Sequence, residues 1–395
     1  MRIQRKGPVL LRPDAVFDGR EVRHGEAVLV RGDRVAAVGP GIAADGAEVH
    51  ELPGCTLLPG LIDLHSHVLL HPYDERPWID QVLRDPLALR VARAVVALRA
   101  TLAAGFTTLR DLGTEGADEA DVGLREAVAQ GIVPGPRLLC VTRAIVARGS
   151  YGPTGFAPHV CVPQGAQEVD GPESIAAATR AQIRAGADWV KVYADYRYGP
   201  AGTARPAFSV DELALIVRIA TDAGCPVAAH ATTAEAMRRA ALAGVATIEH
   251  GNAGDDAAFT LMAERGVAYV PTLAAYEALE RIRGLGPDDP IVVGKREAFA
   301  AALRSGVTIA NGSDIGVFPH GENARELELL VAHGMTSEAA LVAATATAAN
   351  VLRRDDLGMI RAGASADLIA VEGDPTHEIA ALRAVRLVML GGAIA

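Results

Sequence analysis

The chain of 395 residues lacks long apolar runs and has only four cysteines. Every apolar stretch ends well short of the ~18 residues that a membrane helix requires, and the run at residues 9–11 is too short for a signal-peptide core. These absences predict a cytoplasmic protein without a membrane partner. The cysteines, Cys55, Cys140, Cys161 and Cys225, lie far apart in apolar contexts, which is typical of buried, reduced thiols.

Clustered positive charge is also missing. The 38 basic residues are outnumbered by 48 acidic residues, and the resulting net charge of −10 excludes a nucleic-acid or anionic-membrane surface. Only three of the basic residues are lysines: Lys6, Lys191 and Lys295. Because an ammonium group can lose its proton and a guanidinium cannot, a lysine within an apolar stretch draws attention.

What the chain does contain is enough apolar material for a large core. Half of the residues are hydrophobic and 22% are charged, which excludes disorder and fits one large domain with a smaller one. Alanine-rich helical stretches repeatedly end in glycine, and an apolar strand-like run follows, as at Gly244 and Gly266. Capping-box patterns begin at Ser209 and Thr232.

This alternation of helix and strand predicts a parallel α/β sheet. No glycine-rich dinucleotide fingerprint follows a strand, so a closed (β/α)8 TIM-like barrel over residues 58–360 is favoured. The eight predicted strands lie near residues 58–65, 107–112, 136–142, 188–194, 226–230, 246–250, 268–273 and 307–311. Residues 1–57 and 361–395 have short alternating runs and are predicted to pair into a small β-sandwich domain.

Four histidines and one aspartate stand at predicted strand ends. His65 and His67 alternate at the end of the first strand, so both imidazoles point to one side. His230, His250 and Asp314 each end another strand. A lone histidine there is usually a core residue, but the strand ends of a barrel converge at one mouth, so five such residues predict an active site.

Two other polar residues lie within the predicted strands. Lys191 is flanked on both sides by apolar residues, and a buried ammonium is costly unless it is paired or neutral. It either pairs with Asp188 or Asp195, or its neutral amine captures CO2 as a carbamate that bridges two cations. Asp63 is one residue out of phase with the histidines and is expected to bond to the backbone around them.

Together, these residues resemble the metal-dependent amidohydrolase superfamily. The similarity covers nearly the whole chain, including the run Leu58-Pro-Gly-Leu-Ile-Asp-Leu-His and the closing Gly363-Ala-Ser-Ala-Asp-Leu and Gly373-Asp-Pro. It is strongest to the imidazolonepropionase-like branch, which includes Xaa-Pro dipeptidases, other metallo-carboxypeptidases and ochratoxin-hydrolysing amidohydrolases.

The resemblance implies two divalent metal ions. It assigns one to His65, His67 and Asp314 and the other to His230 and His250, with a CO2-derived carbamate on Lys191 between them. These ligands suit zinc first, then manganese or cobalt. The implied reaction is hydrolysis of a linear amide in a dipeptide or N-acyl amino acid. A metal-bridging hydroxide attacks, and Asp314 acts as general base and then general acid. A homo-oligomer is expected by analogy.

The substrate loops depart from the dipeptidase pattern, because the expected Gly-Gly-His and Ser-Gly-Gly stretches are absent. An apolar wall is predicted from Tyr151, Phe156, Tyr193, Tyr196 and Tyr198. Arg148 or Arg197 is a candidate partner for a substrate carboxylate, and both also fit surface arginines. His159 and His320 are candidate oxyanion donors or ordinary polar loop residues.

Three other functions fit parts of this pattern. A mononuclear deaminase would use His65, His67, His230 and Asp314 and release ammonia, although Lys191 counts against it. A hydrolase of cyclic amides, such as lactams or hydantoins, would share the whole binuclear site. A non-catalytic scaffold on this fold is expected to have lost ligands, and all six are present.

Overall fold

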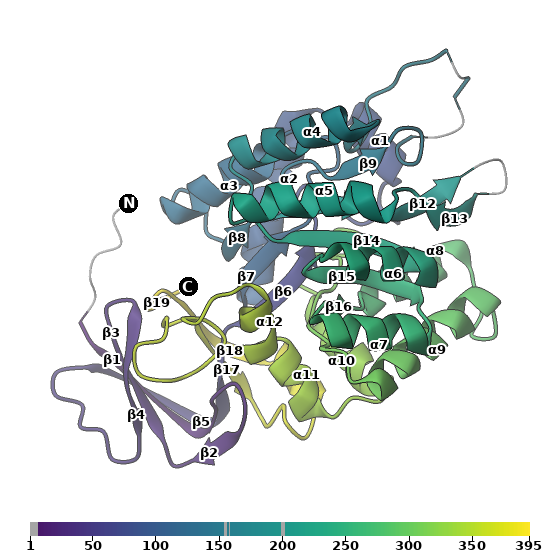
Figure 1. Cartoon of the computed structure of the whole chain (residues 1–395). Helices are drawn as coiled ribbons and strands as arrows, with labels where there is room; N and C mark the ends of the chain where they lie inside the picture. The colour runs from purple at the N-terminus through teal and green to yellow at the C-terminus, as the bar shows by residue number, and fades with distance from the viewer. Residues whose placement is uncertain (1–6, 154–155, 158, 199–201) are drawn as a thin grey trace.

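Strands from both ends of the chain form one sheet. The computed structural model describes residues 7–153, 156–157, 159–198 and 202–395. The sheet has the order β19-β18-β17-β5-β1-β3-β4, with β2 paired to β1 (Figure 1). Its strands are β1 (Val9–Phe17), β2 (Val22–His24), β3 (Ala27–Arg31), β4 (Arg34–Gly39), β5 (Glu48–Pro59), β17 (Leu368–Glu372), β18 (Val385–Leu390) and β19 (Ala393–Ile394).

The long strand β5 holds this sheet together. It runs parallel to β1 and antiparallel to β17, where Ile369 faces Leu58. The predicted pairing of the two chain ends is therefore present, but in one sheet; two packed sheets of a sandwich are not confirmed. Gly60 then separates β5 from the first central strand. A Cβ atom there would lie 2.1 Å from Thr107 Oγ1, so only glycine fits.

The central strands are parallel and form two ladders. One has the order β6-β7-β8 and the other the order β10-β9-β11-β14-β15-β16. The strands are β6 (Leu61–Ser66), β7 (Phe106–Asp111), β8 (Arg137–Leu139), β9 (Ile145–Ala147), β10 (Gln167–Val169), β11 (Val190–Tyr193), β14 (Val227–Thr233), β15 (Thr247–Ala253) and β16 (Ala268–Val270). A separate hairpin joins β12 (Asp195–Tyr198) to β13 (Thr203–Pro206).

Residues 307–315 lie between β16 and β6. The amide of Ala310 donates to the Tyr269 carbonyl at 2.9 Å, and the amide of Leu64 donates to the Asn311 carbonyl at 3.0 Å. The predicted eighth strand is present here only as isolated bridges, such as Tyr269 to Ile309. The fold is thus a TIM-barrel-like α/β fold, although the ladders of the described residues do not form one continuous ring.

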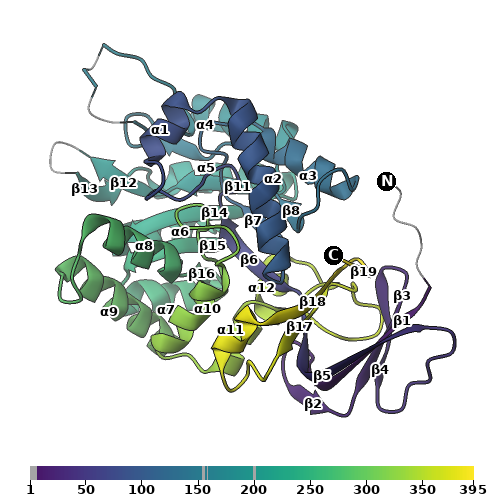
Figure 2. The same ribbon diagram turned by 180° about the vertical axis from the view of Figure 1, so that it is seen from behind.

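Helices cover the outside of the central strands (Figures 1 and 2). They are α1 (Trp78–Arg84), α2 (Leu87–Ala103), α3 (Ala120–Ala129), α4 (Pro172–Arg184), α5 (Val210–Asp222), α6 (Ala234–Ala243), α7 (Asp256–Arg265), α8 (Leu273–Arg283), α9 (Pro290–Ser305), α10 (Ala324–Ala332), α11 (Ser337–Ala343) and α12 (Ala346–Val351), with a 3-10 turn at Ile379–Arg383. Among the described residues, no helix combines the length and apolar character needed to cross a bilayer.

The helix ends follow the sequence signals closely. The predicted capping box at Ser209 starts α5, with the Ser209 hydroxyl and Glu212 bonded to each other's backbone amides. The second signal is displaced by one residue, because Thr233 caps α6 while the Thr232 hydroxyl bonds to Asp195. All four cysteines are free; three are buried as expected, whereas Cys161 is exposed.

Candidate active site

The six predicted ligands come from the central strands or from the loops that follow them. His65 and Lys191 lie in β6 and β11, while His230 and His250 lie in β14 and β15. Because β11, β14 and β15 are parallel neighbours, their ends meet on one side, where His230 pairs with Tyr193 in register. The remaining two ligands, His67 and Asp314, lie in loop segments just after β6 and beyond residue 311.

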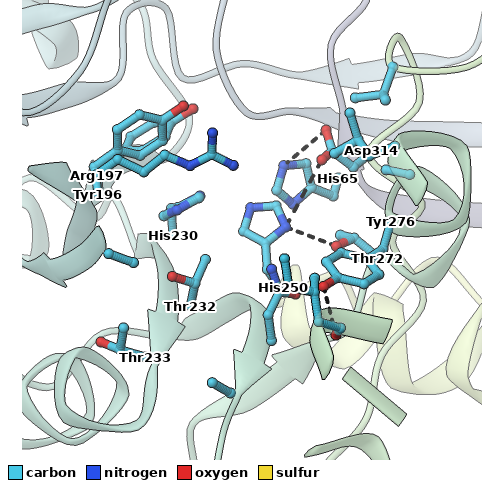
Figure 3. Close-up of a pocket in the computed structure, with 18 of the residues that line it drawn as sticks. His65, Tyr196, Arg197, His230, Thr232, Thr233, His250, Thr272, Tyr276 and Asp314 are labelled. Atoms are coloured by element: carbon cyan, nitrogen blue, oxygen red, sulfur yellow. Dashed lines mark hydrogen bonds and ion pairs between the residues drawn. The ribbon is translucent and has the colours of Figure 1, made fainter. Parts of the chain in front are cut away.

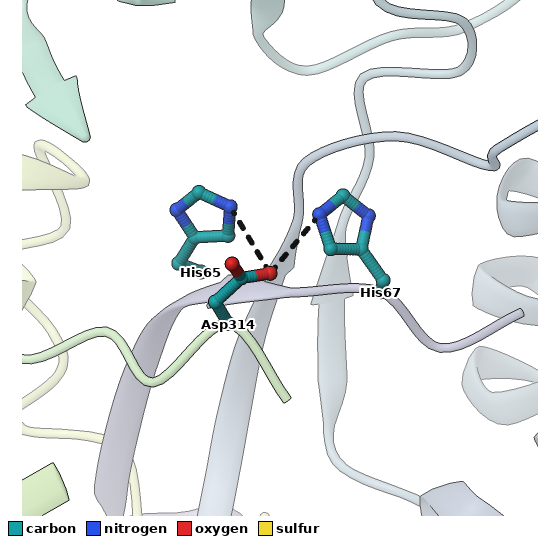
Figure 4. Close-up of side chains that lie close together, drawn as sticks. All are labelled: His65, His67 and Asp314. Carbon is teal, nitrogen blue, oxygen red and sulfur yellow. Dashed lines mark ion pairs between the residues drawn. The ribbon is translucent and has the colours of Figure 1, made fainter. Parts of the chain in front are cut away.

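Three of these side chains form a tight group (Figure 4). The ligand atoms of His65, His67 and Asp314 all lie within 4.8 Å of one another. Asp314 Oδ1 is 3.3 Å from His67 Nε2 and 3.6 Å from His65 Nε2. Two imidazole nitrogens and a carboxylate at this spacing suit a divalent ion such as zinc.

His230 and His250 extend this group across the pocket floor (Figure 3). The His250 ring lies 4.9 Å from that of His65 and 4.5 Å from that of His230, measured between centroids. His250 Nδ1 is 4.0 Å from Asp314 Oδ2. The four imidazoles therefore form a continuous row beside one carboxylate.

Hydrogen bonds fix the orientation of the first two imidazoles. His65 Nδ1 donates to Glu249 Oε2 at 2.8 Å, and His67 Nδ1 donates to the Gly113 carbonyl at 2.8 Å. With Nδ1 protonated, each Nε2 keeps a free lone pair toward Asp314. Glu249 is held in turn by Arg110 at 2.9 Å. The sequence reasoning missed Glu249, although a carboxylate inside an apolar strand was a visible signal.

Burial keeps these imidazoles neutral. It lowers the pKa of His67 and lowers those of His65, His230 and His250 well below the ordinary value, where neighbouring positive groups add to the effect. Burial also raises the pKa of Asp314 well above its usual range, and Lys191 opposes this shift. Since only a neutral imidazole can bind a metal, the histidine environment favours ligation.

Lys191 is buried without an ion partner. Its side chain is 1% exposed, and no carboxylate in the described part of the chain lies within 4.0 Å of its Nζ. Asp188 instead pairs with Arg125 at 2.7 Å, and Asp195 accepts hydrogen bonds from backbone amides in β14. The ion pair weighed for Lys191 is therefore not formed. Burial lowers the pKa of Lys191 to about 8.

Asp63 stabilises the backbone around the cluster, as expected. Its Oδ1 accepts the amides of His65 at 3.1 Å and Ser313 at 2.9 Å. Its Oδ2 accepts from the Ser313 hydroxyl and from Asn323. These bonds join the end of β6 to the segment that carries Asp314, so they set the distance between Asp314 and the two histidines of β6 and the loop after it.

Comparison with known proteins agrees with this site. The model of the amidohydrolase family matches residues 56–395. The chain belongs to the amidohydrolase family. Ochratoxinase of Aspergillus niger is 30% identical over 405 residues, which cover 92% of this chain and 80% of that protein. Imidazolonepropionase of Cutibacterium acnes is 27% identical, covering 87% of this chain and 83% of its own length.

A solved structure extends the similarity to three dimensions. A Xaa-Pro dipeptidase with bound methionine in its active site superposes on this amidohydrolase with a TM-score of 0.89. The two chains are 31% identical, and the match covers 98% of this chain and all of the other. The imidazolonepropionase-like branch predicted from the sequence is thereby confirmed.

The ligand cluster of this amidohydrolase lies in a pocket of about 600 Å³. Tyr151, Tyr193 and Tyr196 line one wall, with the rings of Tyr151 and Tyr193 4.7 Å apart between centroids. The Tyr193 ring also stacks on His230 at 4.5 Å. Figure 3 shows the guanidinium of Arg197 directed into the pocket, toward His65.

Other predicted substrate residues lie elsewhere. His159 is exposed and is not among the residues that line the pocket. His320 bonds through Nε2 to the Leu70 carbonyl at 3.0 Å, outside the pocket lining. Phe156 is 44% exposed, and Arg148 lies 3.4 Å from Asp170. The side chain of Tyr198 is outside the part of the chain that is described.

Glu115 is the pocket residue that sequence reasoning missed most clearly. Its carboxylate accepts hydrogen bonds from Trp78 Nε1 at 2.9 Å, from the Tyr151 hydroxyl, and from the Tyr193 hydroxyl at 3.4 Å. The loop after β7 places it in the pocket lining, and only 2% of it is exposed. Loop residues have no sequence periodicity, so the sequence does not indicate that this glutamate points into the pocket.

The backbone at the site is unusual. Eight described residues other than glycine have positive φ, and four of them line this pocket: Glu115, His250, Thr272 and Asp314. His250 has a φ of 73°, and its Nδ1 forms a 2.8 Å hydrogen bond with the hydroxyl of Thr272. Such conformations persist only where the surroundings enforce them, and they gather at functional sites.

Proposed function

We propose that this amidohydrolase cleaves a linear amide bond, in a dipeptide or an N-acyl amino acid, at a binuclear metal centre. Its family identifies it as a hydrolase acting on C–N bonds. The observation that carries the finer proposal is the convergence of four imidazoles and the Asp314 carboxylate on one pocket, with the buried Lys191 near enough to lower the pKa of His65 and His230.

The ligand atoms suit two divalent ions, with zinc favoured. His65, His67 and Asp314 would hold one ion, and His230 and His250 the other, with Lys191 as the bridge after its neutral amine adds CO2 and releases a proton. These ions supply a hydroxide nucleophile at neutral pH and polarise the scissile carbonyl. The burial of Lys191 without an ion partner supports this assignment.

Asp314 is the proposed proton carrier. Its Oδ1 lies between the His65 and His67 rings, and its side chain is 14% exposed, so it faces the pocket rather than the core. It accepts the proton of the attacking water and delivers it to the departing nitrogen. No protein nucleophile is required, because the oxygen derived from water attacks the carbonyl directly. That oxygen becomes part of the new carboxylate, and the proton leaves on the released amine.

The pocket wall and its arginines select the substrate. Tyr151, Tyr193 and Tyr196 offer apolar surface for a bulky side chain. Arg197 and Arg283 both line the pocket, and within the described ranges neither has a carboxylate within 4.0 Å. A guanidinium without an ion partner at a pocket suits the carboxylate of an amino acid.

Several coarser features complete the proposal. Residues 1–57 and 361–395 would form one domain and residues 58–360 a second, (β/α)8 domain; an apolar cluster confined almost wholly to the first of these ranges supports this division. The free cysteines fit a cytoplasmic location. A homo-oligomer is proposed by analogy with the fold.

The test is metal analysis joined to a substrate screen. The purified chain is loaded with zinc and bicarbonate, its metal is counted, and dipeptides, N-acyl amino acids and lactams are offered. Two metals per chain and release of an amino acid from linear amides are expected. Ammonia release would instead indicate a deaminase, ring opening alone a cyclic-amide hydrolase, and a chain that retains no metal would end the proposal.

A further inference from the structure

A buried carboxylate group, that of Glu115, lies in the pocket without a positive partner among the described residues. Among the described residues, no lysine, arginine or histidine nitrogen lies within 4.0 Å of the Glu115 carboxylate. The guanidinium of Arg90 is close in the fold, but it donates to the carbonyls of Leu69, Thr114 and Glu115 instead. A buried carboxylate with no cation is costly, so a ligand that brings a cation would be favoured.

The two oxygens of Glu115 differ in what they bind. Oε2 accepts from both Trp78 and Tyr151, while the one hydrogen bond to Oε1 from the described residues is the long 3.4 Å contact with the Tyr193 hydroxyl. A carboxylate offers about four acceptor positions, so Oε1 keeps capacity for further donors. The polar contacts of Glu115 therefore fix its orientation and leave one oxygen free.

This free oxygen lies close to the metal ligands. The position that a Cβ atom on Gly113 would occupy is 3.4 Å from Glu115 Oε1 and 3.7 Å from His67 Cε1. Glu115 Oε1 and His67 Cε1 are therefore at most about 7 Å apart, and both residues line the pocket. A substrate whose scissile carbonyl lies at the histidine cluster can therefore reach Glu115 with a group only a few bonds away.

A cluster of tyrosines lies beside the Glu115 carboxylate, and two of them, Tyr151 and Tyr193, donate to it through their hydroxyls. The Tyr151 and Tyr193 rings are 4.7 Å apart, and the Tyr196 ring is 4.8 Å from that of Tyr151, measured between centroids. The faces of aromatic rings attract cations, and a carboxylate among them strengthens that attraction. A neutral acyl group would gain the apolar contact but would leave the carboxylate without a counter-ion.

We infer that Glu115 binds the free α-amino group of the substrate, so that dipeptides are preferred over N-acyl amino acids. This rests on the amide hydrolysis proposed above. The α-ammonium lies two bonds from the scissile carbonyl carbon, which matches the short distance between the Glu115 carboxylate and His67. Arg197 and Arg283 then receive the carboxylate, and the substrate is a zwitterion.

The experiment compares Phe-Ala with N-acetyl-Phe-Ala, in which the same bond is cleaved. The wild-type kcat/KM is expected to favour the free amine roughly 10- to 100-fold, the usual range for a hydrogen bond to a charged group. E115Q should reduce that preference at least about ten-fold, mainly through KM, whereas E115D should retain it because the charge remains.

Controls separate recognition from other roles. R197Q should weaken both substrates equally, and E119Q, which changes an exposed glutamate on the same segment, should alter neither. Metal per chain should stay at the wild-type value in E115Q; a loss would mean that Glu115 supports the metal centre and would overturn the inference.

The wild-type comparison needs no variant, so it decides the question even if E115Q does not fold. Equal hydrolysis of the two substrates would contradict the role of Glu115 and leave amide hydrolysis intact. Hydrolysis of neither peptide nor any other amide would refute the proposed function itself.

Discussion

At the scale of single residues, the proposed binuclear centre depends most on Lys191. Chains of this kind seldom bury an ammonium without a partner, and here the nearby acids Asp188 and Asp195 are engaged elsewhere. We expect K191A to lose most bound metal and to lower kcat/KM by at least about 100-fold, because it would remove the proposed bridging ligand. Metal analysis measures this directly, and added short carboxylic acids should restore part of the activity.

D188N is the matched control for that experiment, because Asp188 lies three residues away in an ion pair with Arg125. It should keep the wild-type metal content. Full metal occupancy in K191A would show that Lys191 does not bridge the ions.

D314N tests the proposed proton transfer, and its metal content is measured as well because Asp314 is also a proposed metal ligand. D314N keeps the shape and one oxygen of the side chain but cannot accept the proton. We expect kcat to fall by about 10²- to 10⁴-fold while the fold and much of the metal remain. Steady-state kinetics on a cleaved dipeptide, with metal content measured in parallel, checks this. Turnover near that of the wild type would remove Asp314 from the role of general base.

At the scale of elements, α9 supports the strained end of β15. Lys295 Nζ, 2% exposed as a residue, donates to the carbonyls of His250 at 2.5 Å and Pro271 at 2.7 Å and to Asn252 Oδ1 at 2.8 Å. The Tyr269 hydroxyl also donates to the His250 carbonyl at 2.9 Å. One helix thus binds the ends of two strands and holds His250 in its left-handed conformation.

We expect K295M to lower the free energy of unfolding by about 3 kcal/mol, because it leaves buried carbonyl groups without donors. Urea denaturation measures the change. Metal content should fall as well, since the backbone of His250 loses its support. R296M, at the next position of α9, is the control and should change neither quantity. An unchanged stability of K295M would mean that the three hydrogen bonds contribute nothing net.

Site residues in strands could be predicted from the sequence, whereas those in loops could not. His65, His230 and His250 were found because a strand has a fixed period and a fixed end, so residue spacing reports direction. Glu115 and His159 lie in loops, where the spacing of residues does not indicate the direction of a side chain. Glu115 is buried in the pocket, whereas His159 is exposed and does not line it.

The segment predicted as the eighth strand lies where it was expected, but it forms isolated bridges instead of a regular strand. Residues 307–311 are apolar enough for a strand, yet Asn311 and Gly312 lie where the backbone must approach β6 closely. A Cβ atom on Gly312 would lie 2.3 Å from Val270 and 3.0 Å from His65. Contact with two neighbouring strands, rather than local propensity, decides the conformation there.

At the scale of the whole molecule, the small sheet is joined to the central strands by more than the covalent chain. The Gly60 amide donates to the Asp367 carbonyl at 2.7 Å, and Arg137 at the start of β8 lies 3.1 Å from the Asp367 carboxylate. A second contact joins Arg34 of β4 to Asp356, which follows α12, at 3.5 Å. The two ends of the chain thus stabilise the wall that carries the ligands.

Asp356 makes this joint sensitive to pH. Hydrogen bonds from Arg354 at 2.8 and 2.9 Å, opposed by burial, lower the pKa of Asp356 to about 2. A carboxyl whose pKa is lower in the folded state stabilises the protein above its unfolded pKa of about 4, and this contribution disappears as the pH falls toward 2. We therefore expect D356N to cost about 2 kcal/mol at pH 7 and progressively less below pH 4. Urea denaturation of both proteins across this range measures the difference, with D355N at the exposed neighbouring position as the control. A difference that stays constant down to the lowest pH at which both fold would show that the contribution of Asp356 does not come from its charge.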